Sequence, residues 1–521
     1  MRELDRLCES YGDLLRHLDP AAASAAGSVS GDGRLGQFDG EALRQHLAAF
    51  RATAAAIEEL ELDALADEID RTALLDDVRA TIARLEEDRP QVRNPGFWVD
   101  HLAQAVASLL LRADEPAAPG LRATAAAERI ADIPGFLESA RATLLHPPLM
   151  LVDGALAALG PAGELLVEAA VRFGPDAPGG RDALNPLVAE ALQALTGFGH
   201  WLRSEVEPEP GLGAAALGEA RFDRRIHHRY AVRDAPTELW RYALRLLDET
   251  EAALAAESRA IDSARSWRDL LARTNEETVL ALPGLSGELE RARALLDEQA
   301  IAVATVPAVL IAAPSVRSTL GDITYLPALE PPASGEARFV LSTDRLSRAM
   351  LPAIAAAGLA GRHLQESRAR GLGSEVRRRL RAPIAVEGWA LYAEQWMEEL
   401  GVGAGREARL VRLARLLRAA GRLAADVGIH ARGMKQADAI ALLGDRAGLA
   451  RDAAETDVRW IVSHPTDGAA AALGRREILA LRTGAGVPAD GGPALHRFHA
   501  DLLGFGALPP GLAGWGMGLA A

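Results

Sequence analysis

Apolar residues recur every three or four positions through most of the chain, with charged residues between them. Within residues 63–86 one apolar stripe comprises Leu65, Ile69, Ala73, Leu74, Val78, Ile82 and Leu85. This spacing matches the 3.6-residue period of an α-helix that buries one face. The same period predicts further helices over residues 237–271, 285–298, 384–400, 407–421 and 449–464. The chain is therefore expected to be mainly α-helical.

Three short runs rich in Val, Ile and Phe interrupt this pattern, at residues 301–305, 309–313 and 337–343. Pro and Gly bound these runs, which is typical of short strands. We expect one small β-sheet at about residues 300–345, followed by a long helical stretch from about Arg345 to residue 400.

A run of Pro and Gly at residues 207–211 is the clearest break between helical blocks. It predicts an N-terminal helical half, residues 1–206, and a C-terminal half, residues 212–521, that carries the sheet and the helices after it. A chain of 521 residues exceeds the size at which one core stops growing, so we expect more than one core.

The charge balance narrows the range of partners. The chain has 57 Lys and Arg against 72 Asp and Glu, a net charge of −15. Nucleic acids and anionic membranes select basic surfaces, so neither is expected as a partner. The single cysteine, Cys8, excludes internal disulfides and cysteine metal clusters. The oligomeric state stays open.

The first ten residues alternate charged side chains with Leu and show no apolar signal region. The longest uncharged apolar stretch, residues 300–314, is too short to cross a membrane as a helix. These features predict a cytoplasmic protein.

Several segments place reactive side chains in a fixed order. These segments are Gly27 to Asp39 with Asp32 and Phe38, Arg93-Asn-Pro-Gly-Phe-Trp98, Leu359-Ala-Gly-Arg-His-Leu-Gln365, Glu387-Gly-Trp-Ala-Leu-Tyr-Ala-Glu394, Leu473-Gly-Arg-Arg-Glu-Ile-Leu-Ala-Leu-Arg482 and Phe498-His-Ala-Asp-Leu-Leu-Gly-Phe-Gly-Ala-Leu-Pro509. In this order, and over nearly the whole chain, they resemble the bacterial family known as domain of unknown function 885.

The resemblance implies a zincin-like metallopeptidase fold with a small sheet and a central cleft. The family motif reads H-E-x-x-P-G-H-H-L-Q and is followed by a helix with E-G-W-A-x-Y-x-E. Such a motif would supply His and Glu ligands to zinc and a Glu that takes a proton from the bound water.

This chain departs from that motif at the positions that would carry the chemistry. His363, Leu364 and Gln365 match its end, and Glu387, Trp389, Tyr392 and Glu394 match the second helix. The positions of the first His, the general base, the Pro and the next His hold Ala356, Ala357, Ala360 and Arg362. Alanine cannot coordinate a metal, and arginine offers only donors. We therefore expect no metal ligands and no cofactor.

Arg362 would place a permanent positive charge near the position that the family motif gives to a cation. A buried Glu387 would need a partner, so we predict an ion pair between Arg362 and Glu387. The alternative is that Arg362 lies on a solvated helix face.

The candidate catalytic residues are His363, Glu387, Glu394 and Tyr325, and the candidate binding residues are Arg362, Gln365, Trp389, Tyr392, Arg482 and His499. A histidine or carboxylate pair could transfer protons, Tyr325 could support an oxyanion, and Arg482 could bind a substrate carboxylate. Each also has a structural interpretation: a hydrogen bond inside the bundle, a solvated helix face, or an aromatic at a strand end.

Three functions remain open at this point, and whether the protein is an enzyme is undecided. The first is a pseudo-metallopeptidase that has lost its zinc and binds a peptide or a small acidic metabolite in the cleft. The second is a metal-independent enzyme that uses His363 with Glu387 or Glu394 as acid and base, and Arg362 or Arg482 as an anion binder. The third is an active zinc hydrolase whose ligands lie elsewhere in the chain.

Overall fold

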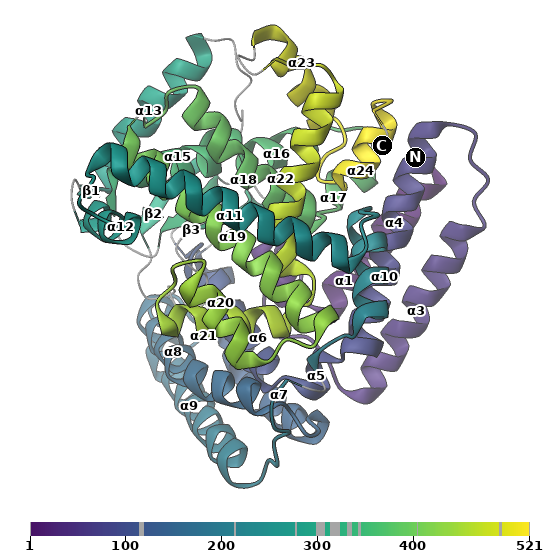
Figure 1. Cartoon of the computed structure of the whole chain (residues 1–521). Helices are drawn as coiled ribbons and strands as arrows, with labels where there is room; N and C mark the ends of the chain where they lie inside the picture. Colours follow the sequence, from purple (N-terminus) through teal and green to yellow (C-terminus); the bar gives the residue numbers. More distant parts are fainter. Residues whose placement is uncertain are drawn as a thin grey trace.

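The computed structural model describes residues 2–113, 119–212, 215–276, 279–298, 308–312, 323–330, 336–341, 345–403, 405–488 and 492–519. Helices dominate, as predicted, and Figure 1 shows the labelled strands β1, β2 and β3 on the left side of the view. The first part contains α1 (Glu3–Leu18), α2 (Pro20–Ala25), α3 (Gly40–Glu58), α4 (Leu65–Ala83), the π-helical turn η1 (Arg84–Asp88), α5 (Pro90–Arg93), α6 (Pro95–Leu110), α7 (Pro119–Thr143), α8 (Leu149–Phe173) and α9 (Gly180–Ser204).

The second part begins with α10 (Glu219–Tyr230), α11 (Pro236–Ile261), α12 (Trp267–Glu276) and α13 (Leu282–Glu298). After the strands come the 3-10 turn η4 (Arg348–Met350), α15 (Leu351–Ala355), the π-helical turn η5 (Ala356–Ala360), α16 (Arg362–Arg370), α17 (Glu375–Arg379), α18 (Pro383–Glu399), α19 (Arg406–Arg432), α20 (Gln436–Asp445), α21 (Arg451–Ser463), α22 (Asp467–Gly484), α23 (Gly492–Leu503) and α24 (Pro510–Gly516). Helix α11 packs along α19, and α18 packs against α22.

Short polar residues fix several helix starts. The side chain of Asp19 accepts a hydrogen bond from the amide of Ala22 at 2.8 Å, and Asn94 accepts one from Gly96 at 2.9 Å. In both cases a proline follows at the first helical position, where its missing N–H is not needed. The Asp-Pro and Asn-Pro pairs therefore begin helices α2 and α6.

The sheet is mixed and has the strand order β2-β4-β3. Strand β4 (Ala337–Leu341) runs parallel to β2 (Ala308–Ala312) and antiparallel to β3 (Ile323–Leu326). Every residue of β4 is buried, and its residues other than Arg338 are apolar. The guanidinium of Arg338 donates to the carbonyl of Leu111 at 2.8 Å. The predicted strands at 309–313 and 337–343 are confirmed within a residue or two, whereas 301–305 lies outside the described residues.

Three local predictions are wrong. No long helix begins at Arg345, because that residue starts strand β5 (Arg345–Ser347), which pairs with β1 (Val279–Ala281) in a second, two-stranded sheet. The predicted helix 237–271 is two helices separated by a turn in which Asp262 bonds the amide of Ala264.

The third error concerns Gly421, which does not end its helix. It lies inside α19, where an added Cβ would stand 2.8 Å from the Cβ of Ala447. The glycine therefore allows close packing, and the helix continues to Gly433, whose φ of 68° permits the left-handed cap.

The interior contains several apolar clusters, as the length of the chain predicted. One is centred on the N-terminal helices, but it also includes Leu326, Val340, Val376 and Leu380 from the second half. A second joins α10, α11, α18, α19 and α22, and a third surrounds Trp389, Tyr392 and Trp396. The first cluster brings the N-terminal helices against strand β3 and helix α17.

Among the described residues, α8 alone has the length and composition of a membrane-spanning helix. It has 25 residues and a mean hydropathy of 1.5 in its most apolar window, of which 39% is buried. Core helices of water-soluble proteins share these properties, so the helix does not by itself indicate a membrane protein.

Candidate functional site

The candidate site is built on a break between two helices. The π-helical turn η5 ends at Gly361, whose φ of −96° and ψ of −121° are not helical, and α16 starts at the next residue. An added Cβ on Gly361 would lie 2.2 Å from the carbonyl oxygen of Ala356, so a larger residue cannot adopt this bend. The indole N–H of Trp389 donates to the carbonyls of Ala360 and Gly361, at 3.0 and 3.1 Å, and holds the break against α18.

The predicted ion pair between Arg362 and Glu387 is present. A guanidinium nitrogen of Arg362, in the first turn of α16, donates to the carboxylate of Glu387 on α18. The two side chains are 31% and 43% exposed, so the pair is accessible to solvent rather than buried.

Tyr325 and His363 form a second polar pair beside the first. The hydroxyl of Tyr325 lies 3.0 Å from Nδ1 of His363, which is fully buried. The ring of Phe339, on the neighbouring strand, packs edge-on against His363. Burial raises the pKa of Tyr325 above its usual value, so its hydroxyl stays protonated at neutral pH.

Three other candidates meet in a separate buried cluster. The hydroxyl of Tyr392 lies 2.7 Å from Nε2 of His499, and Arg482 lies 3.5 Å from the same hydroxyl. Burial, and then the charges of Arg482 and His496, lower the pKa of His499 to about 3, so this imidazole is neutral. The cluster lies within the aromatic core around Trp389 and Trp396.

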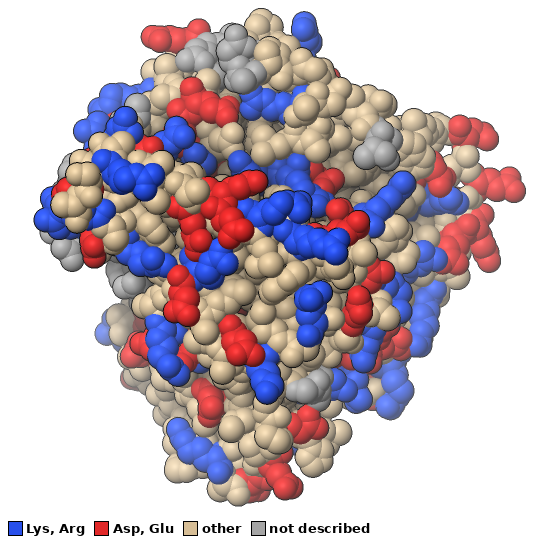
Figure 2. Space-filling model, viewed as in Figure 1, with Lys and Arg blue, Asp and Glu red and all other residues tan. Residues whose placement is uncertain are grey.

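Glu394 faces a different neighbour from Glu387, although they lie two turns apart on one helix. Its carboxylate, which is 6% exposed, receives hydrogen bonds of 2.7–3.0 Å from Arg415 of α19. Because Glu394 is bound by Arg415 and Glu387 by Arg362, the structure does not join the two glutamates into a carboxylate pair. Figure 2 shows basic and acidic side chains interleaved on the face that carries α11 and α19.

The residues at the positions of the zinc motif do not fit a zinc ion. Ala356 and Ala360 are buried methyl groups on η5, and Arg362 is bound to Glu387. Within the part of the chain that the structure describes, no group of three or more His, Cys, Asp and Glu side chains is placed to hold a metal.

A pocket of about 610 Å³ opens between the N-terminal helices and the site helices. Its apolar lining includes Leu15, Leu18, Phe38, Leu85, Phe97, Leu380 and Val386. Its basic residues are Arg16, Arg84, Arg362, Arg378, Arg379 and Arg381, and its acidic residues are Asp19, Asp77, Glu330 and Glu366. We call it the arginine pocket.

Residues from four segments that are far apart in sequence meet in the arginine pocket. Phe38 and Phe97 come from the two early motifs, Tyr325 from strand β3, and Gln365 with Arg362 from α16. Of the predicted site residues, these last three line the pocket. The other predicted site residues are not part of its lining: His363, Glu387, Trp389, Tyr392, Glu394, Arg482 and His499.

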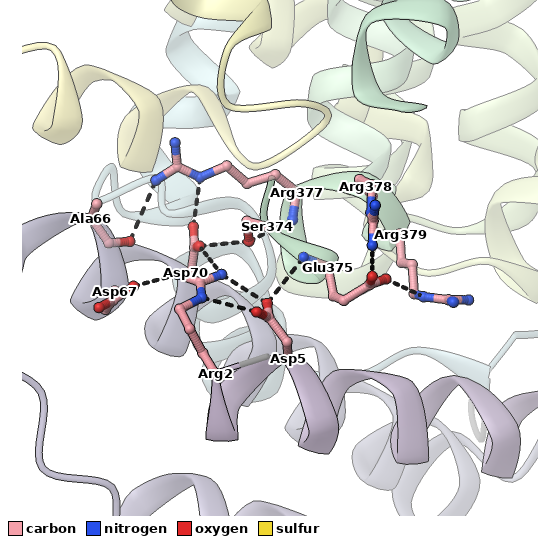
Figure 3. Close-up of polar contacts among 10 residues, drawn as sticks. All are labelled: Arg2, Asp5, Ala66, Asp67, Asp70, Ser374, Glu375, Arg377, Arg378 and Arg379. Carbon is pink, nitrogen blue, oxygen red and sulfur yellow. Dashed lines mark hydrogen bonds and ion pairs between the residues drawn. The ribbon is translucent and has the colours of Figure 1, made fainter. Parts of the chain in front are cut away.

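A buried polar network anchors the helix that carries two of the pocket arginines. Asp70 of α4, 1% exposed, accepts hydrogen bonds from Ser374 at 2.6 Å and from Arg377 at 2.7 Å (Figure 3). Arg2 also contacts Asp70, at 3.3 Å. The network therefore fixes α17 against the N-terminal helices.

Sequence reasoning missed most of the pocket. Within α17, Glu375 pairs with both Arg378 and Arg379, and these arginines line the pocket. The run of arginines at 377–381 was a signal that could have found this wall. Glu366, which follows Gln365 on α16, is bound by Arg381 at 2.6 Å and also lines the pocket.

Comparison with known proteins gives a family and a fold. The model of a bacterial protein family of unknown function, DUF885, matches residues 20–513. No curated protein matches the chain in sequence.

Two solved structures share the fold. One is described as a "putative lipoprotein of unknown function" from Shewanella oneidensis; it is 18% identical, with 99% of this chain and 100% of that chain covered and a TM-score of 0.72. The other is a "putative lipoprotein" from Colwellia psychrerythraea, 16% identical, with coverages of 99% and 98% and a TM-score of 0.79. At these low identities, the similarity shows a shared fold and does not show a shared function.

These neighbours correct the prediction of a cytoplasmic protein. Both are described as lipoproteins, which points to a location on a membrane or outside the cytoplasm. That prediction was wrong because it relied on the polar first ten residues and on an apolar stretch too short to cross a membrane, and folded proteins of either compartment share these properties.

Proposed function

The chain belongs to this bacterial family of unknown function, and we propose that it binds a small acidic molecule, or the carboxylate of a peptide, in the arginine pocket. In this proposal the protein is a pseudo-metallopeptidase: it keeps a ligand pocket beside the position of the zinc motif and works without zinc.

The observation that carries the proposal is the concentration of arginine in the pocket. Six arginines and four carboxylates line it, in a chain whose net charge is −15. A guanidinium presents paired donors that match a carboxylate, so an arginine of the pocket can bind an acid group through two hydrogen bonds. Arg84 is exposed and has no ion-pair partner among the described residues, so it can contact a ligand directly.

The ion pair of Arg362 with Glu387 supports the loss of zinc. Glu387 matches the position that the family motif gives to a metal ligand, and here a guanidinium binds its carboxylate. Arg362 supplies a positive charge, but its guanidinium stays protonated and cannot accept a hydrogen bond or a proton. It therefore cannot generate a hydroxide nucleophile from water as a metal ion does.

Isothermal titration calorimetry on the full chain tests the proposal. The probes are succinate, the dipeptide Ala-Phe and its C-terminal amide. We expect Arg84→Gln to weaken carboxylate binding about tenfold or more, since a charge-assisted hydrogen bond contributes about 1.5–3 kcal/mol. The control is Arg446→Gln, because Arg446 pairs with Asp248 and Glu251 away from the pocket.

Two results would contradict the proposal: no heat with any acid probe, or equal affinity for Ala-Phe and its amide. Stoichiometric zinc in protein purified without chelator would instead support the third function, an active zinc hydrolase.

The pair of Tyr325 and His363 favours a second candidate function, a metal-independent enzyme. The 3.0 Å contact joins a hydroxyl on the pocket wall to a buried imidazole, an arrangement that can relay a proton to a bound ligand. Tyr325→Phe and His363→Asn should then abolish turnover of a bound ligand and leave its affinity within a few-fold. Unchanged turnover in both variants would reject this candidate.

A further inference from the structure

The N-terminal wall of the arginine pocket carries a hydrogen-bonded chain of three side chains. The hydroxyl of Tyr11, on α1, donates to the carboxylate of Asp77 at 2.8 Å and lies 2.7 Å from the hydroxyl of Thr81. Tyr11 is 2% exposed, and all three residues line the pocket. Because Tyr11 has one hydroxyl proton and gives it to Asp77, Thr81 is the donor in the second contact.

Asp77 differs from Glu366 and Asp19, two other carboxylates of this pocket, in the partners of its side chain. Glu366 is bound by Arg381 on two oxygens, and Asp19 caps helix α2. Asp77, by contrast, has no ion-pair partner among the described residues, and its one described side-chain contact is the neutral Tyr11 hydroxyl.

No ion pair compensates the burial of Asp77 among the described residues. Burial raises the pKa of this carboxyl group, and the hydrogen bond from Tyr11 and the more distant charge of Arg229 lower it only in part. Arg229 is itself paired with Asp467. A carboxylate held in place by a buried hydroxyl, beside a cavity and without a counter-ion, is suited to bind a cationic group of a ligand.

We propose that Asp77 binds an ammonium group, so that the ligand of the arginine pocket is a zwitterion: an amino acid or a short peptide with both ends free. This inference rests on the proposed function, in which arginines of the same pocket bind the acid group. Leu15, Phe38 and Phe97, which line the same pocket, provide an apolar surface for the ligand's side chains. A volume of about 610 Å³ accommodates a ligand of this size.

Calorimetric titrations with three matched probes test this inference: Leu-Phe, N-acetyl-Leu-Phe, which has lost its positive charge, and Leu-Phe amide, which has lost its negative charge. We expect Leu-Phe to bind at least about tenfold more tightly than either derivative, as one charge-assisted contact contributes about 1.5–3 kcal/mol. Asp77→Asn should weaken Leu-Phe about tenfold and leave N-acetyl-Leu-Phe unchanged.

Asp76 provides the matched control. It is the preceding residue on α4, it is half-buried, and it faces His228 at 3.4 Å without lining the pocket. Asp76→Asn should leave the affinities of all three probes unchanged. If Asp77→Asn fails to fold, Tyr11→Phe replaces it, since it removes the hydroxyl that orients Asp77 and should reduce the preference for the free amine.

The possible outcomes separate this inference from the function on which it rests. Equal binding of Leu-Phe and N-acetyl-Leu-Phe, both tighter than the amide, would overturn the ammonium site and leave acid binding intact. No binding of any probe would overturn both. A preference for Leu-Phe that persists in Asp77→Asn would show that another group recognises the amine, and would also overturn the assignment to Asp77.

Discussion

Replacing Gly388 by alanine tests the helix crossing on which the candidate site depends. Gly388 of α18 faces Gly474 of α22, and an added Cβ would lie 2.4 Å from the Cα of Gly474. In the reverse direction, a Cβ on Gly474 would lie 2.0 Å from the carbonyl oxygen of Ile384. Carbon atoms in contact normally stand about 3.5–4.0 Å apart. Because backbone lies on both sides, no side-chain rotation relieves the clash, and the helices must separate by more than about 1 Å.

The expected loss of stability follows from two opposing effects. Overpacking a tight core costs about 1–3 kcal/mol, and we expect about 3 kcal/mol here because backbone must move. Alanine is the better helix former by about 1 kcal/mol. The free energy of unfolding should therefore fall by about 2 kcal/mol in Gly388→Ala.

Gly135→Ala is the matched control for this prediction. Gly135 lies inside helix α7, and an added Cβ there meets no atom within 4 Å. This variant should gain stability by up to about 1 kcal/mol. Urea unfolding followed by circular dichroism at 222 nm measures both variants. If Gly388→Ala were as stable as Gly135→Ala, the close crossing of α18 and α22 would be refuted.

Three further predictions concern the polar contacts. Asp70→Asn should lower the free energy of unfolding by about 3–5 kcal/mol, because Asp70 is 1% exposed and binds Arg377; trypsin should then cut faster around α17. Glu387→Gln should lower the free energy of unfolding by less than about 1 kcal/mol, because its ion pair is open to solvent. Glu394→Gln should lower it by about 2 kcal/mol, because its carboxylate is buried. Equal urea midpoints for the two variants would contradict this difference. The folded protein keeps His499 neutral down to its pKa of about 3, whereas the unfolded chain binds a proton near 6.5. Stability should therefore fall as pH drops below about 6.5, by up to about 1.4 kcal/mol per pH unit for this group, and His499→Gln should make the urea midpoint less sensitive to acid.

The sequence could predict what depends on nearby residues. The 3.6-residue period locates α4, α13, α18 and α21 within a few residues, because each buries one continuous apolar face. The ion pair of Arg362 with Glu387 was predictable from the resemblance, because Arg362 stands at a His position of the family motif and Glu387 matches its Glu. By contrast, β3 and β5 are three or four residues long and pair only with distant segments, so no local pattern indicates them.

Contacts that depend on tertiary packing escaped prediction. Tyr11 and Asp77 are separated by 66 residues and meet only because α1 packs beside α4. The wall formed by Arg378 and Arg379 depends on the anchoring of α17 by Asp70, some 300 residues earlier. Gly388 and Gly474 were visible in the motifs, but their role in a helix crossing depends on the partner helix.

In the proposed function an ion pair takes the place of a metal site, and this separates two properties that a zinc ion combines. A zinc ion attracts anions, and its open coordination position also activates water. The guanidinium of Arg362 keeps the first property and lacks the second, because it offers only donors and stays protonated. A pocket altered in this way can still select an acidic ligand by charge. Any reaction at this position would have to draw its proton transfer from other groups, and the contact of Tyr325, which lines the pocket, with the buried His363 could provide it.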